Sequence, residues 1–162
     1  MITIRPLVST AHCPTDDINR LLSELSSSSS QKPATESELL GLIGNPHFHF
    51  FLATEQKLGA ERCAGMATIF FQRVASRWVA EIHDVVVDKQ FRRRGVGELL
   101  LDRLLAEAER YANNFKEKIK VDLTSKPDRI AANKMYKKAG FTLIATATKG
   151  GTNLYRKIMT PT

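Results

Sequence analysis

Residues 88–97 read DKQFRRRGVG, a basic turn with two glycines between a strand-like stretch and a helical one. The stretch before it, 78–87, is rich in aromatic and β-branched residues, which favour strands. The stretch after it places apolar residues at helical spacing, namely Val96, Leu100, Leu104, Leu105, Ala108 and Tyr111. The order strand, glycine turn, helix is the pattern from which the fold and the site are predicted.

The glycine turn suits an anionic ligand. A helix N-terminus presents unpaired backbone N–H groups and a partial positive charge, so phosphate oxygens bind there without any particular side chain. Gly95 and Gly97 let the backbone approach closely, and Arg92, Arg93 and Arg94 add charge-assisted donors. This composition predicts a site that binds a pyrophosphate group. The alternative is a surface turn of solvated arginines.

Two other phosphate-binding motifs do not fit the turn. A dinucleotide-binding GxGxxG would need a glycine where Leu100 stands, and a P-loop would need Gly-Lys-Ser or Gly-Lys-Thr after its first glycine. The sequence therefore favours neither a dinucleotide nor a nucleoside triphosphate.

The flanking segments predict a mixed sheet. Strands are expected at residues 1–6, 48–54, 63–71, 78–87 and 118–123, followed by a hairpin of 141–147 with 153–158. The three strands from 48 to 87 form an antiparallel meander. The strand-helix-strand crossover that carries the glycine turn requires a parallel neighbour in the same sheet.

Helix signals complete the pattern. A first helix carries Ile18, Leu21, Leu22 and Leu25 behind Thr15. Capping-box residues at Thr35 and Glu38 open a second helix, which stops near Gly41 or Gly44. A last helix runs from Asp128, as N-cap, to Gly140. The serine run from Ser26 to Ser30 is expected to be a flexible loop.

Composition limits the class of protein. The 162 residues, 43% hydrophobic and 25% charged, predict one domain over 1–162, without a membrane span and located in the cytoplasm. The net charge of +7 favours an anionic partner. Cys13 and Cys63 have neither disulfide nor zinc spacing, and the pair His47 and His49 lacks a third ligand nearby, so no metal is predicted.

Three segments resemble the GNAT superfamily of N-acetyltransferases. The family's coenzyme motif Q/R-x-x-G-x-G/A corresponds to Arg92–Gly97, its preceding strand to Ala80–Val87, and its second coenzyme-contacting helix to Asn133–Phe141. They occur in the family's order. The resemblance implies an α/β fold with a mixed, mostly antiparallel sheet of six to seven strands flanked by four helices, and acetyl-CoA as the acyl donor.

The resemblance also implies roles for individual residues. The backbone of Val85, Val86 and Val87 would bind pantetheine and the thioester oxygen, although the same valines suit a buried strand. Tyr136 would contact the coenzyme and protonate the departing thiolate, unless it is a core residue. Asn133 would also contact the coenzyme, unless it is a polar residue of the helix's first turn. The implied pyrophosphate site comprises Arg92, Arg93, Arg94, Gly95, Val96, Gly97 and Glu98.

The general base has two candidates. Glu81 lies at a spacing from Arg92 that resembles the histone-acetylating branch of the family, whereas Asp84 resembles the corresponding strand of glucosamine-phosphate acetyltransferases. Strand alternation puts Glu81 and His83 on one face and Asp84 on the other, unless a bulge re-aims them. His83 could relay a proton, and a water chain could replace any single base.

The acceptor is the least specified part. Residues 123–129 and 152–156 resemble a microbial subgroup without an agreed substrate, and Thr124, Ser125 and Tyr155 are candidates to line the acceptor cleft. We expect the primary amine of a small molecule, with a protein or peptide lysine or N-terminus as the alternative. A nucleic-acid-binding module without catalysis ranks last, because no aromatic-interleaved basic stripe is present. A homodimer through the last strands is a further possibility that the family suggests.

Overall fold

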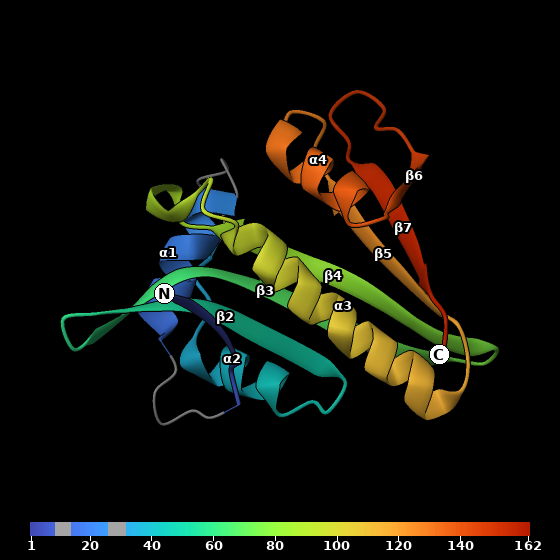
Figure 1. Ribbon diagram of the computed structural model, residues 1–162, viewed down its shortest axis with the longest axis horizontal. Coiled ribbons are helices and arrows are strands. Elements are labelled where there is room, and N and C mark those ends of the chain that lie inside the picture. Colours follow the sequence, from blue (N-terminus) through green and yellow to red (C-terminus); the bar gives the residue numbers. More distant parts are fainter. Residues whose placement is uncertain (9–13, 26–31) are drawn as a thin grey trace. The chain divides into compact units, whose positions relative to one another are not determined.

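A computed structural model of the chain describes residues 1–8, 14–25 and 32–162 (Figure 1). The predicted serine loop and Cys13 lie outside these residues. The helices are α1 (Thr15–Leu25), α2 (Glu36–Ile43), α3 (Val96–Phe115) and α4 (Ile130–Lys138), with a 3-10 turn η1 (Lys89–Phe91). The strands are β1 (Ile2–Pro6), β2 (Phe48–Lys57), β3 (Ala60–Val74), β4 (Arg77–Val87), β5 (Ile119–Ser125), β6 (Thr142–Ala145) and β7 (Asn153–Met159).

The seven strands form one sheet in the order β1-β2-β3-β4-β5-β7-β6. Strand β1 is antiparallel to β2, and β7 is antiparallel to both β5 and β6. Strands β4 and β5 are parallel, as the crossover through α3 predicts. The mixed α/β fold expected from the sequence is confirmed, with four α-helices in the part of the chain that the structure describes.

Residue contacts divide the chain into two compact units. One comprises 1–68 and 84–103, and the other comprises 69–83 and 104–162. We call them the N-terminal unit and the C-terminal unit. Strands β3 and β4 and helix α3 each contribute residues to both units.

In the N-terminal unit, strand β2 is buried on both faces. Phe50 and Leu52 pack in an apolar cluster with residues of α1 and α2, whereas Phe51 faces the guanidinium of Arg103 on α3, 4.9 Å from its ring centre. The remaining buried members of that cluster are Leu7, Ile18, Leu21, Leu39, Cys63, Met66 and Val86. Because both faces are covered, β2 shows a continuous apolar run where a half-buried strand would alternate.

Helix α2 begins as its sequence predicts. Thr35 accepts a hydrogen bond from the Glu38 backbone N–H, and the Glu38 carboxylate accepts one from the Thr35 N–H. This reciprocal pair is a capping box. The bonds that the Glu38 carboxylate accepts from the backbone N–H and the hydroxyl of Thr35 lower the pKa of Glu38. The helix ends at Gly44, one of the two predicted stops.

The C-terminal unit has an aromatic core. Tyr111 of α3 stacks on Phe71 of β3, with ring centres 3.6 Å apart, and meets Trp78 of β4 edge-on. Tyr136 of α4 lies 6.2 Å from Phe141 between ring centres. The predicted final hairpin is confirmed by the pairing of β6 with β7.

The prediction that Asp128 caps the last helix is wrong. Helix α4 begins at Ile130 after Arg129, which makes no side-chain cap bond. The Arg129 N–H donates to the Lys126 carbonyl at 3.1 Å, so Pro127 and Asp128 form the middle of a turn. Aspartate is favoured in turns as well as at caps, and a preceding proline favours the turn. Gly140, with φ of 89°, follows the end of α4 as predicted.

Candidate functional site

The glycine turn of the N-terminal unit is exposed and leads into α3. Residues 92–95 are exposed, whereas Phe91 before them and Val96 after them are buried and anchor the turn at both ends. Gly95 has φ of 75°, a left-handed conformation that glycine adopts without strain, and a Cβ built there would meet nothing within 4 Å. Among the described residues, nothing therefore fills the place of a side chain at Gly95.

Arg93 also adopts the left-handed conformation, with φ of 61°. This conformation costs a non-glycine residue roughly 1 kcal/mol. The Gly95 carbonyl accepts from the Leu99 N–H at 3.0 Å, the first turn of a helix that runs through Phe115. A helix of this length presents a positive N-terminal dipole to an anion, and Gly97 and Glu98 lie in its first turn.

Arg92 and Arg94 of the turn have carboxylate partners among the described residues. Arg92 donates from Nη2 to Glu24 at 3.0 Å and from Nε to the Val87 carbonyl at 3.1 Å. Arg94 donates to Glu55 at 2.6 Å, which lowers the pKa of Glu55. The guanidinium of Arg94 also lies 4.9 Å from the ring centre of Phe91.

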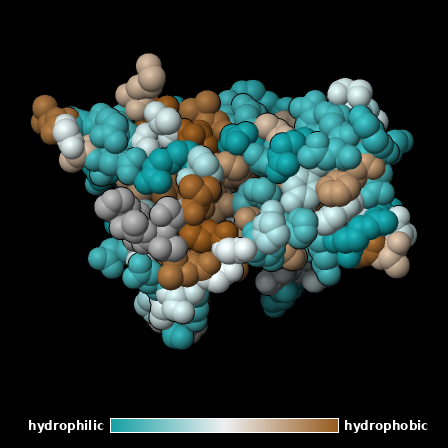
Figure 2. Space-filling view, turned by 90° about the horizontal axis from the view of Figure 1, so that it is seen from below, coloured by the Kyte–Doolittle hydropathy of each residue, from teal (hydrophilic) through white to brown (hydrophobic). Residues whose placement is uncertain are grey.

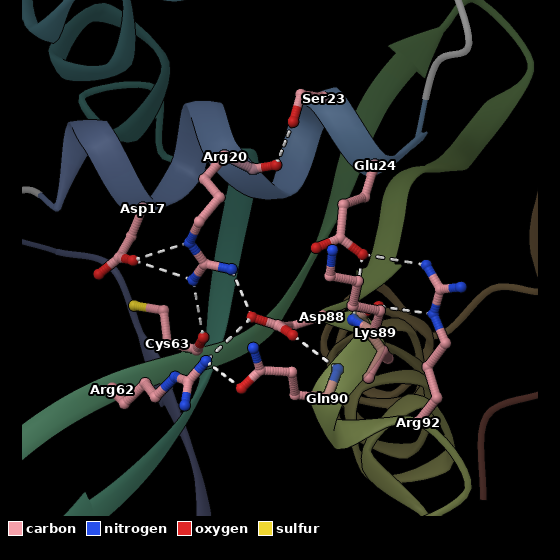
Figure 3. Close-up of polar contacts among 11 residues, drawn as sticks. Asp17, Arg20, Ser23, Glu24, Arg62, Cys63, Asp88, Lys89, Gln90 and Arg92 are labelled. Atoms are coloured by element: carbon pink, nitrogen blue, oxygen red, sulfur yellow. Dashed lines mark hydrogen bonds and ion pairs between the residues drawn. The ribbon is translucent and has the colours of Figure 1, made fainter.

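Asp88, directly before η1, is a buried carboxylate at the centre of a charged network (Figure 3). It accepts from the Gln90 N–H at 2.8 Å, forms an ion pair with Arg20 of α1, and lies 3.9 Å from Arg62 of β3. Asp88 was not among the site residues predicted from the sequence. Its position between a strand and a turn could have indicated a structural role, because aspartate often binds a backbone N–H two residues further along the chain.

Arg20 also ties α1 to β3. It donates to Asp17 at 2.9 Å and to the Cys63 carbonyl at 3.1 Å. Burial lowers the pKa of Arg20, but hydrogen bonds to the two aspartates outweigh it and raise the pKa above its usual value. Cys63 is buried, and desolvation raises the pKa of its thiol to about 12, so this cysteine stays protonated.

Strand β4 becomes irregular at Asp84. Buried and exposed residues alternate up to Ile82, but Val85 and Val86 are both buried. Asp84 itself has φ of 53°. On the neighbouring strand, a Cβ built on Gly65 would lie 2.8 Å from the Val86 carbonyl oxygen. Sequence reasoning missed Gly65, whose lack of a side chain gives the Val86 backbone its place.

In the C-terminal unit, Glu81 and His83 lie on the same face of β4, as alternation predicts. The Nε2 atom of His83 is 3.1 Å from Oε2 of Glu81, and both side chains are exposed. Glu81 is in register with Asp122 of β5, whose carboxylate binds Arg156 through two hydrogen bonds of 2.7 and 2.9 Å. Glu81 is thus an accessible acid on a charged face of this unit.

The two candidates on α4 are buried in the C-terminal unit. Tyr136 is 2% exposed, and desolvation by burial raises the pKa of its phenol. The Nδ2 group of Asn133 donates to the carbonyls of Lys126 and Pro127 at 3.0 and 3.3 Å. Its Oδ1 and the hydroxyl of Ser125 are buried polar atoms that bind no partner among the described residues. An unpaired buried acceptor fits a site that receives a donor from a ligand.

The predicted acceptor-lining residues differ in exposure. Thr124 is exposed, whereas Ser125 and Tyr155 are buried.

Hydrophilic side chains cover most of the face shown in Figure 2. No described helix is long and apolar enough to cross a membrane. Within residues 1–8, 14–25 and 32–162, no three His, Cys, Asp or Glu side chains gather as metal ligands.

Comparisons with known proteins agree with this architecture. Residues 15–141 match the model of the acetyltransferase (GNAT) family. No curated protein sequence matches the chain significantly.

Several solved structures share the fold. An N-acetyltransferase from Staphylococcus aureus Mu50 superposes with a TM-score of 0.73 at 19% identity, over 97% of this chain and 98% of that one. A glucosamine-6-phosphate N-acetyltransferase from Arabidopsis thaliana gives 0.69 at 18% identity, over 91% and 96%. A chain of the NatC complex bound to Gag peptide and CoA gives 0.73 at 15% identity, over 99% of both chains. At these identities the likeness shows the fold alone.

Proposed function

Since the chain belongs to the acetyltransferase (GNAT) family, we propose that it transfers the acetyl group of acetyl-CoA to the primary amine of a small molecule. Members of this family use acetyl-CoA, and the chain is an acetyltransferase. The observation that carries the coenzyme proposal is the exposed glycine turn at the N-terminus of α3, where Gly95 is left-handed and no described atom lies within 4 Å of its Cβ position. Family membership removes the alternative of a nucleic-acid-binding module without catalysis.

The turn binds the pyrophosphate through backbone N–H groups in this proposal. Residues 92–98 supply them, and the helix dipole adds to the attraction. The backbone of Val85, Val86 and Val87 binds the pantetheine arm and the thioester oxygen. Asn133 contributes its unpaired Oδ1, because its amide hydrogens are already bound to two carbonyls.

The bound coenzyme would supply an activated acyl group, a thioester, for direct attack by the amine. The amine must lose a proton and the departing thiolate must gain one. Tyr136 is the candidate for the second task, because a phenol carries a proton at neutral pH; the burial that raises its pKa also makes it a weaker acid. Glu81, exposed beside His83, or Asp84, at the irregular point of β4, takes the proton from the amine.

A peptide or protein amine is the second candidate acceptor. The exposed carboxylate of Glu81 suits a lysine ammonium as well as a small cationic amine. Proteins of the same fold include both a sugar-phosphate acetyltransferase and a complex bound to a peptide. The small amine stays our first choice, and turnover assays with both classes of amine distinguish the two.

Calorimetric titration with acetyl-CoA, with adenosine diphosphate as the phosphate-only comparison, tests the coenzyme. We expect stoichiometric binding of acetyl-CoA. Gly97→Trp should abolish it by filling the turn, while Gly41→Trp, a glycine in α2 with nothing within 4 Å of its Cβ position, should not. Unchanged affinity in Gly97→Trp would sink the pyrophosphate assignment. Turnover of a panel of free amines against lysine peptides then separates the two acceptors.

A further inference from the structure

Two charged side chains of helix α1 contact residues 88–92, the segment that joins β4 to the glycine turn, which is the coenzyme turn of the proposed function (Figure 3). Arg20 and Glu24 are one helical turn apart and therefore lie on the same face of α1. Arg20 binds Asp88 and Glu24 binds Lys89 and Arg92, so the two side chains meet successive residues of one short segment.

Glu24 makes two contacts with that segment. Its Oε2 accepts from the backbone N–H of Lys89 at 3.0 Å and from Nη2 of Arg92 at 3.0 Å. The side chain of Glu24 is 19% exposed, so water competes little for the carboxylate. A backbone donor and a guanidinium on the same oxygen fix the carboxylate in one place.

Arg92 spans two elements. Its Nε donates to the Val87 carbonyl at the end of β4, and its Nη2 donates to Glu24 on α1. The planar guanidinium holds these two donors in a rigid arrangement. To bind a phosphate directly, Arg92 would have to give up both contacts or share a charge that Glu24 already neutralises.

We propose that Glu24 and Arg92 are positioning residues of the coenzyme turn, and that Arg92 acts on acetyl-CoA binding through Glu24 without touching the phosphates. The inference rests on the proposed function. It places α1, more than sixty residues away in sequence, in control of the backbone that receives the pyrophosphate.

A double-mutant cycle tests the proposal. The dissociation constant of acetyl-CoA is measured by calorimetry for Glu24→Ala, Arg92→Ala and the double variant. We expect each single change to weaken binding about fivefold and the double to be no weaker than the worse single, because the two side chains act as one unit. If the double variant weakens binding by the product of the two single effects, Arg92 contacts the coenzyme independently of Glu24, which would overturn the proposal. Tighter binding by Glu24→Ala would overturn it as well.

Kinetics and a conservative variant separate positioning from general loss of stability. The KM for acetyl-CoA should rise in both single variants while kcat at saturating coenzyme stays unchanged. Glu24→Gln keeps an oxygen that can accept from Lys89 and should recover most of the affinity. Asp16→Asn on α1 and Arg77→Ala on β4 remove the same charges away from the segment and should bind like the wild type. A fall in kcat alone would contradict the positioning role.

Hydrogen exchange of the Lys89 amide in the ligand-free protein distinguishes this inference from the proposed function. Glu24→Ala should speed that exchange, and Glu24→Gln should restore protection, whether or not acetyl-CoA binds. Failure of the wild type to bind acetyl-CoA would refute the proposed function. Unchanged Lys89 exchange in Glu24→Ala would refute the positioning of this segment by Glu24, whether or not acetyl-CoA binds.

Discussion

Replacement of Gly65 by alanine tests whether the close approach of β3 to β4 fixes the irregular backbone. The added Cβ would lie 2.8 Å from the Val86 carbonyl oxygen and 3.2 Å from Cδ1 of Leu100. The leucine end can rotate, but the oxygen belongs to the backbone of β4. The strand must therefore shift by a few tenths of an ångström to admit a single methyl group.

The expected cost follows from two opposing effects. Overpacking of a filled interior costs about 1–3 kcal/mol. Replacing glycine by alanine reduces the conformational freedom of the unfolded chain, which returns roughly 0.5–1 kcal/mol. Gly65→Ala should therefore lower the free energy of unfolding by about 1–2 kcal/mol, as urea denaturation can measure. Because Val86 and Val87 are proposed coenzyme contacts, acetyl-CoA should also bind more weakly.

Gly41→Ala is the matched control. Gly41 lies within α2, where a Cβ would meet nothing within 4 Å, so alanine should stabilise the protein by up to about 1 kcal/mol. A Gly65→Ala protein as stable as the wild type, with normal acetyl-CoA affinity, would refute the reasoning. An equal increase in the free energy of unfolding in Gly65→Ala and Gly41→Ala would show that β4 accommodates the new methyl group without cost.

Three further changes are predicted. Tyr136→Phe should lower kcat more than it weakens acetyl-CoA binding, and full activity would remove the acid role. Thr35→Ala should lower the unfolding free energy by about 1 kcal/mol through loss of the cap. Because hydrogen bonds from Thr35 lower the pKa of Glu38, the separate contribution of that carboxylate to stability should be present above the carboxyl's ordinary pKa and fade as pH falls below it, as urea titrations at several pH values can show. Arg20→Met should cost roughly 2 kcal/mol in urea unfolding by leaving the buried Asp88 poorly paired.

The sequence predicted those parts of the fold that local patterns determine. Stretches rich in aromatic and β-branched residues located the strands, helical spacing located the helices, and the crossover rule predicted that β4 and β5 are parallel. The capping box at Thr35 needs no tertiary information, because its two bonds join residues of one helical turn. The prediction that Asp128 is a helix N-cap failed because aspartate is favoured both in turns and at caps, and the neighbouring residues decide which of the two it forms.

Contacts between distant segments could not be predicted in the same way. The basic turn indicated three arginines open to phosphate, yet Glu24 and Glu55 bind two of them from far along the chain. No periodicity records which carboxylate reaches which guanidinium. The role of Gly65 could not be predicted for a similar reason, because the close approach of the Val86 backbone is known only from the structure.

A site that binds its ligand through the backbone has to be held rigidly, because backbone groups cannot adjust by rotation as side chains do. The segment from β4 to α3 is held in this way from two sides: Gly65 lets β3 approach Val86, and α1 binds Asp88, Lys89 and Arg92. A buried carboxylate is costly, and such a cost is expected where the geometry it fixes matters. In the proposed site the same reasoning would account for the plain valines at 85–87, since recognition by N–H and carbonyl groups would place no chemical demand on their side chains.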